Sequence, residues 1–191
     1  MGVFLYFLRH GQTAYSLTGG YCGMPENDPG LTPEGVRRAV ETARPLCESV
    51  GLEMQLRDGL REVMYGRWEG MHPTVVDREH HDEYVAWLTD PAWYAPVGGE
   101  RAVDIARRSA QVLDEIERNH SSGHILMVSH KATIRIMLCT LLGIDVGRYR
   151  DRLDMPVAAV SVVELGQRGP LFHTIADRSH LSDQLRSLPC T

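Results

Sequence analysis

Two stretches of the chain are apolar over several consecutive residues and then turn abruptly polar. Residues 3–8 (VFLYFL) run into residues 9–11 (RHG), and residues 125–128 (ILMV) run into residues 129–131 (SHK). Continuous apolar runs of this length are typical of strands buried on both faces, as in a parallel sheet covered by helices. The pattern therefore predicts two buried strands, each followed at its carboxyl end by a histidine.

A helix is predicted before the second of these strands. Thr32 can cap its first turn, Pro33 suits the first helical position, and Glu34 lies at the positive end of the helix dipole. Pro45 lacks the backbone N–H that a helix interior requires, so we expect the helix to kink or end there.

The rest of the chain continues the alternation of strands and helices. Helical patterns are expected over residues 73–88, 100–120 and 132–142, and strand patterns over residues 52–56, 158–165 and 171–175. This alternation predicts an α/β fold, a three-layer α/β/α sandwich around a mainly parallel sheet. A length of 191 residues without a linker or repeat suits a single domain, residues 1–191.

Composition and charge narrow the range of functions. The chain is 43% hydrophobic and 24% charged, as in ordinary soluble domains, and its net charge of −5 gives no reason to expect a nucleic acid or an anionic membrane as partner. Its four cysteines have no metal-binding or redox spacing. No apolar run has the length of a membrane span or the flanks of a signal peptide, so we expect a cytoplasmic protein.

The two histidines are expected to meet at one edge of the sheet, because parallel strands end on the same edge and open α/β sheets bind ligands there. Arg9 offers a planar guanidinium for phosphate, and the imidazole of His10 is a usable nucleophile or base near neutral pH. From the first strand alone, a capped surface strand and an anion site are equally compatible. The matching end at His130 favours the anion site. Glu62 is the best-placed carboxylate, although most glutamates are simply solvated.

Several motifs, in this order along the chain, resemble the histidine phosphatase superfamily and, within it, the phosphoglycerate mutase-like branch. They are LRHGQT at 8–13, LRE at 60–62 with YGRWEG at 65–70, GGE at 98–100 and VSH at 128–130. The resemblance implies a phosphoryl transfer through a phosphohistidine that needs no metal ion or other cofactor.

The resemblance also implies a role for each site residue. His10 would accept the phosphoryl group, while Arg9 and His130 would hold its oxygens. Glu62 would protonate the leaving alcohol and then activate the water that releases phosphate. By their places in the family motifs, Ser16 and Arg38 would complete the phosphate-binding set.

One departure from the family pattern concerns Arg38. In the family a helix and a strand separate the LTxxG helix motif from the segment that bears a second phosphate-binding arginine. Here LTPEG at 31–35 runs almost directly into RAVETA at 38–43. The resemblance thus implies a fold shorter by one helix and one strand, in which Arg38 lacks the strand end that would aim it. A sheet edge exposed by that loss would make a homodimer reasonable.

Three functions remain open from the sequence. The first is a metal-independent phosphatase acting on small phosphorylated metabolites, such as sugar phosphates or phosphorylated carboxylic acids. A phosphoglycerate mutase is less favoured, because Tyr15 and Ser16 stand where family mutases carry a Trp-Asn pair, and the loops are short. The third is a catalytically weak protein that binds a phosphorylated metabolite. A dinucleotide-binding unit is excluded, since no Gly-x-Gly-x-x-Gly follows the first strand.

Overall fold

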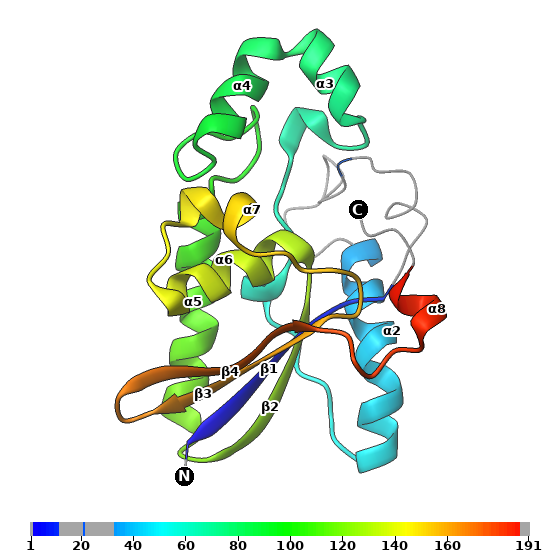
Figure 1. Ribbon diagram of the computed structural model, residues 1–191, viewed down its shortest axis with the longest axis vertical. Coiled ribbons are helices and arrows are strands. Elements are labelled where there is room, and N and C mark those ends of the chain that lie inside the picture. Colours follow the sequence, from blue (N-terminus) through cyan, green and yellow to red (C-terminus); the bar gives the residue numbers. More distant parts are fainter. Residues whose placement is uncertain (1, 12–20, 22–32, 188–191) are drawn as a thin grey trace.

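The computed structural model describes residues 2–11, 21 and 33–187, and for residues 33–36 the backbone alone. It has an α/β fold with one sheet in the strand order β2-β1-β3-β4 (Figure 1). The strands are β1 (Val3–Arg9), β2 (Gly123–Ser129), β3 (Val160–Gly166) and β4 (Gly169–Asp177).

The α/β class is confirmed, but the sheet is mixed where the pattern predicted a mainly parallel one. β1 and β2 are parallel, whereas the β1–β3 and β3–β4 pairs are antiparallel. The reason is the hairpin expected near the end of the chain, which returns beside β1 and adds two strands in the antiparallel sense. The parallel pair is the one that carries both histidines.

β1 is a central strand of the sheet and contributes much of the core. Its buried side chains Val3, Leu5 and Phe7 alternate with half-buried ones, because successive strand side chains point to opposite faces. The buried set packs in one cluster with α5 (Ala102–Asn119) and α6 (Lys131–Leu142). The apolar run at residues 3–8 is therefore fully buried on one face and half-buried on the other.

α2 (Pro33–Val50) lies across the sheet from α5 (Figure 1). It continues as one helix through Pro45, so the helix does not end there. The apolar residues Ala39, Ala43, Leu46 and Val50 recur at helical spacing on both sides of the proline. The stripe is buried before the proline, at Ala43, and exposed after it, at Leu46 and Val50.

Other elements differ from expectation at two places. Residues 52–56 belong to no strand: β2 is the nearest edge of the sheet, and they do not pair with it. The helix expected over residues 73–88 is divided at His80, whose backbone (φ −136°, ψ 39°) leaves the helical region. The remaining helices are η1 (Asp58–Leu60), η2 (Gly66–Trp68), α3 (Pro73–Glu79), α4 (His81–Thr89), η3 (Val146–Arg148), α7 (Tyr149–Arg152) and α8 (Asp183–Arg186).

A second, smaller core lies beneath α3 and α4. Trp68, Val76 and Trp87 are buried in it, with aromatic rings packed edge to face around them. In Figure 1 this part of the chain stands above the carboxyl ends of β1 and β2. No helix within the described ranges is both long enough and apolar enough to span a membrane.

Candidate active site

His10 and His130 directly follow β1 and β2. The parallel register pairs Arg9 with Ser129, so the next residue of each strand brings an imidazole to the same place. The two ring centroids are 5.0 Å apart, with the ring planes at 60°. The backbone N–H of His10 donates to the carbonyl of Ser129 at 3.0 Å, which extends the ladder beyond the strands. The predicted convergence of the two histidines is confirmed.

The proton on the His10 ring is held on one nitrogen. Nδ1 lies 2.7 Å from the carbonyl oxygen of Gly11. Because a carbonyl can only accept, this bond places the proton on Nδ1 and leaves the lone pair of Nε2 available. Burial, together with the neighbouring His130, lowers the pKa of His10 to about 4. The ring is therefore neutral at pH 7, in the form that a nucleophile requires.

His130 occupies the residue before α6 and is 4% exposed. Burial, with the positive charges of Arg38 and Arg108, lowers its pKa to about 3. A neutral imidazole keeps one N–H group, which at this place can donate a hydrogen bond to a phosphoryl oxygen.

Two arginines bring positive charge to the pair of rings. Arg9 is 4% exposed, and its Nη1 donates to the carbonyl of Met155 at 2.7 Å. Arg38, in the second turn of α2, is close enough for its charge to act on the pKa of His130. Both cations therefore lie where an anionic phosphoryl group beside the histidines would be stabilised.

Arg38 is held by a helix, α2, and not by the end of a strand. Thr42 lies one turn further along α2, and its Oγ1 accepts a hydrogen bond from the Gly11 N–H at 3.2 Å. The same hydroxyl donates to the carbonyl of Arg38 at 2.8 Å. The bond from Gly11 ties α2 directly to the loop after β1, and the bond to Arg38 links this contact to the turn that carries the arginine.

Glu62 lies at the N-terminus of α6. Its carboxylate accepts from the backbone N–H of Val63 at 2.9 Å, of Thr133 at 3.3 Å and of Ala132 at 3.4 Å. The open N–H groups of the helix thus hold the carboxylate beside the histidine that precedes them. Its negative charge also acts on the pKa of His10, so the two side chains share one site.

Glu100, the acid of the GGE motif, is a residue whose role the sequence did not reveal. Glu100 accepts from Arg61 at 2.7 and 2.8 Å and from Arg108 at 3.0 and 3.2 Å. Arg108 also donates to the carbonyls of Gly59 and Glu62. This network fixes the segment that carries Glu62. The signal that could have revealed this ion pair is the occurrence of an arginine in one motif, Arg61 in LRE, and an acid in another, Glu100 in GGE.

Ser16, expected to bind phosphate, lies outside the described residues. Within residues 2–11, 21 and 33–187, no three His, Cys, Asp or Glu side chains are grouped so that they could hold a metal ion. The described site therefore consists of four groups around His10: Arg9, Arg38, Glu62 and His130.

Comparison with known proteins agrees with this geometry. The family model for the histidine phosphatase superfamily (branch 1) matches residues 36–178. Phosphoserine phosphatase 1 of Hydrogenobacter thermophilus is 24% identical over 202 residues, covering 94% of each chain. Glucosyl-3-phosphoglycerate phosphatase of Mycolicibacterium vanbaalenii is 28% identical over 173 residues, covering 76% of each chain.

The fold is shared with solved structures. The alpha-ribazole phosphatase of Shigella flexneri superposes with a TM-score of 0.77 at 21% identity, covering 91% of this chain and 96% of that chain. The family match covers most of the chain, and the sheet carries the two histidines at the ends of its parallel pair. The chain therefore belongs to branch 1 of the histidine phosphatase superfamily and is a phosphatase of that family.

Proposed function

We propose that this protein hydrolyses small phosphorylated metabolites, such as sugar phosphates or phosphorylated carboxylic acids, through a phosphohistidine on His10 and without a metal ion. The observation that carries the proposal is the state of His10. Its Nδ1 proton is directed at the Gly11 carbonyl, and burial keeps the ring neutral. The names of the two similar proteins, a phosphoserine phosphatase and a glucosyl-3-phosphoglycerate phosphatase, support a phosphomonoester of a small molecule.

In the first step, the lone pair of His10 Nε2 forms a bond to phosphorus as the bond from phosphorus to the ester oxygen breaks. The electron pair of the broken bond stays on that oxygen, which takes a proton from Glu62 and leaves as an alcohol. Arg9, Arg38 and His130 stabilise the charge on the phosphoryl oxygens as they pass through the plane of the transition state.

In the second step, a water molecule attacks the phosphorus of the phosphohistidine. Glu62, now a carboxylate, takes a proton from the water, and the bond between phosphorus and Nε2 breaks. The electron pair of that bond returns to Nε2, so the ring regains its neutral form and inorganic phosphate leaves. Ser16 is expected to contribute a further hydrogen bond to the phosphoryl group.

The proposal is tested by trapping the covalent intermediate in chelator-treated protein. Wild type is mixed with phosphoserine or a sugar phosphate labelled with ³²P and quenched in alkali, which preserves phosphohistidine. We expect label on the protein and steady release of inorganic phosphate, and neither with His10→Asn, which keeps a polar side chain but removes the nucleophilic nitrogen. Turnover by His10→Asn equal to wild type would contradict the role of His10.

The same experiment separates the alternatives. A phosphoglycerate mutase would label His10 but convert 3-phosphoglycerate to its isomer faster than it releases phosphate. A protein that only binds a phosphorylated metabolite would show neither label nor phosphate release, while retaining binding measurable by calorimetry.

A further inference from the structure

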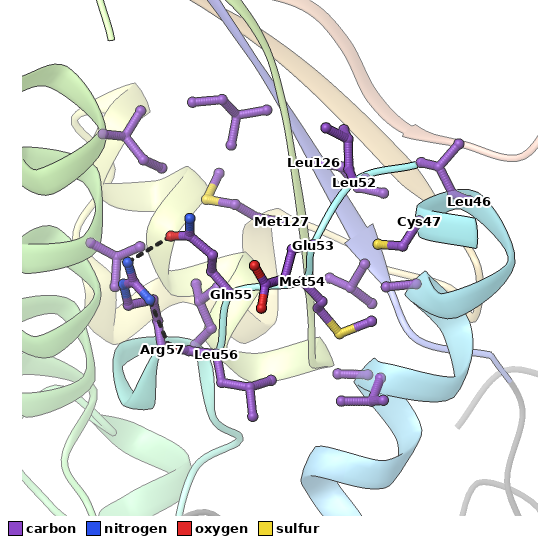
Figure 2. A pocket seen from close by; sticks show the side chains of 18 of the residues that line it. Leu46, Cys47, Leu52, Glu53, Met54, Gln55, Leu56, Arg57, Leu126 and Met127 are labelled. Atoms are coloured by element: carbon purple, nitrogen blue, oxygen red, sulfur yellow. Dashed lines mark hydrogen bonds between the residues drawn. The ribbon is translucent and has the colours of Figure 1, made fainter. Parts of the chain in front are cut away.

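A cavity of about 590 Å³ lies beside β2, between that strand and α2. One wall is the apolar stripe of α2, which includes Ala43 and Leu46, and the opposite wall includes Val112 and Ile116 of α5. Residues 52–57 border the cavity along its length, as Figure 2 shows for the side chains from Leu52 to Arg57. The volume falls in the range of ligand-binding pockets, about 300–1,000 Å³.

The cavity begins at the active site. Glu62 and His130 both belong to its lining, together with Arg61. Since Glu62 is the residue that we assign to the leaving oxygen, whatever is attached to that oxygen can extend into this space. The cavity therefore continues the proposed active site rather than forming a separate pocket.

The cavity also has the form of an empty strand position. β2 ends the sheet, and no described strand lies on its outer side. The bond from His10 N–H to the Ser129 carbonyl shows that Ser129 directs its backbone groups to β1. Backbone direction alternates along a strand, so the N–H and C=O groups of Leu126 and Val128 point outward, into the cavity. A strand placed there would be paired by these groups.

Both faces of this position carry apolar side chains, and the ion pair between Arg57 and Glu115 also lines the cavity. α2 covers one side and α5 the other, and exposed side chains line the open rim: Leu46 is 47% exposed, Leu52 68% and Leu56 53%. A small apolar ligand would cover these side chains but leave the outward backbone groups of β2 without partners. An extended peptide satisfies both requirements, because its backbone pairs with β2 and its side chains fill the two faces.

We propose that this slot binds an extended apolar peptide as an added strand beside β2, and that the peptide presents a phosphoserine or phosphothreonine to His10. The cleavage chemistry rests on the function proposed above, whereas the binding does not. Residues 124–128 offer about 17 Å of strand edge, which suits a segment of about five residues. The phosphorylated residue then lies at the level of His130, where the slot meets Glu62.

The test compares phosphopeptides with a minimal substrate. The peptides carry Val-Thr-Val-Thr-Val on either the amino or the carboxyl side of one phosphoserine, and the reference is N-acetylphosphoserine amide. We expect kcat/KM for one of the two peptides to exceed that of the reference about tenfold or more. N-methylation of alternate residues should lower it about fivefold for each backbone hydrogen bond lost, equivalent to about 1 kcal/mol.

Variants of α2 provide the matched controls. Ala43→Phe and Leu46→Trp fill the slot and should bring the peptide down to the rate of the reference. Arg44→Phe adds a ring on the exposed face of the same helix, outside the cavity, and should retain the preference. Fluorescence anisotropy of the labelled, unphosphorylated peptide should show binding to wild type and to Arg44→Phe only.

The outcomes separate the two proposals. Hydrolysis of peptides and reference at the same kcat/KM, with no peptide binding, would overturn the strand slot and leave the phosphatase standing. Binding without hydrolysis of any phosphomonoester would support the slot and overturn the proposed function. A preference for octyl phosphate over both peptides, with no effect of N-methylation, would show that a small apolar group fills the cavity and would overturn the peptide.

Discussion

The ring of His130 lies at 60° to the ring of His10 with centroids 5.0 Å apart, and its presence is one reason why the pKa of His10 falls to about 4. A consequence can be measured by NMR. Neither ring should titrate between pH 8 and 5, whereas the exposed His81, whose pKa is raised by Asp77, should do so. In His130→Asn the pKa of His10 should rise. Titration of either buried ring near pH 6.5 in wild type would contradict the burial described above.

The same two groups predict how stability depends on pH. Their folded pKa values, about 4 and about 3, lie below the unfolded value of 6.5. Below pH 6.5 the unfolded chain binds protons that the folded chain does not, so stability falls as the pH decreases, until the pH passes the folded values. Between pH 7 and 5 each histidine should cost about 2 kcal/mol of unfolding free energy in urea titrations.

The double variant His10→Asn, His130→Asn is the control for that measurement. It lacks both titrating groups, so its unfolding free energy should change less over the same interval. An equally steep dependence in the double variant would show that other groups cause it.

Arg38 should matter for catalysis although it lies on a helix and not at a strand end. Arg38→Met keeps much of the side chain but removes the charge, so kcat/KM should fall about 100-fold for a phosphomonoester. Because that charge holds down the pKa of His130, the pKa should rise in the same variant. The neighbouring Arg37, which is exposed and pairs with Glu41, provides the control. Arg37→Met should change kcat/KM less than twofold.

Glu62 should matter most when the leaving group is poor. For an alkyl phosphate, whose leaving oxygen needs a proton, Glu62→Gln should reduce kcat/KM about 10² to 10⁴-fold. For p-nitrophenyl phosphate the first step should be affected much less, so a rapid burst of nitrophenol should precede slow turnover. Glu53→Gln, at the far part of the cavity, should leave both substrates unaffected. Equal losses on both substrates in the first step would contradict the role as acid.

Glu100 should be required for stability. Its carboxylate lies between Arg61 and Arg108, so Glu100→Gln removes the counter-charge that two largely buried cations share. Among the described residues, only Arg61 keeps another acidic partner in an ion pair, Asp58. The unfolding free energy should fall by about 3–5 kcal/mol. The comparison is Glu115→Gln, where the ion pair with Arg57 is 35% exposed on both sides and should contribute much less to the unfolding free energy. Similar losses of unfolding free energy in both variants would show that the effect of Glu100→Gln does not come from burial of its ion pairs.

The elements with unbroken apolar runs were predictable from sequence, and so was the meeting of the two histidines. Both follow from local rules: apolar runs such as residues 3–8 and 125–128 are typical of strands, and parallel neighbours end on one edge. The resemblance placed Arg38 in the phosphate-binding set, but the way in which α2 brings it to His130 was not predictable. It depends on the hydrogen bond from Gly11 to Thr42, which joins residues far apart in sequence.

The errors have the same origin. Pro45 looked like a helix end because the proline costs a local hydrogen bond, but the apolar stripe of α2 continues on both sides of it. Residues 52–56 have the alternation of a strand, but the cavity separates them from β2 and they pair with no strand of the described chain. Glu100 was given no role, since one of its two arginines is distant in sequence and the other lies two turns along a helix.

The strands that precede the two histidines differ in how many neighbouring strands stabilise them. The strand before His10 is hydrogen-bonded on both sides, whereas the strand before His130 has a neighbouring strand on one side only among the residues that the structure describes. Amide hydrogens of β2 should therefore exchange with solvent through smaller openings than those of β1. When the enzyme begins to lose activity under mild denaturant, the site should come apart from the His130 side while the nucleophile is still in place.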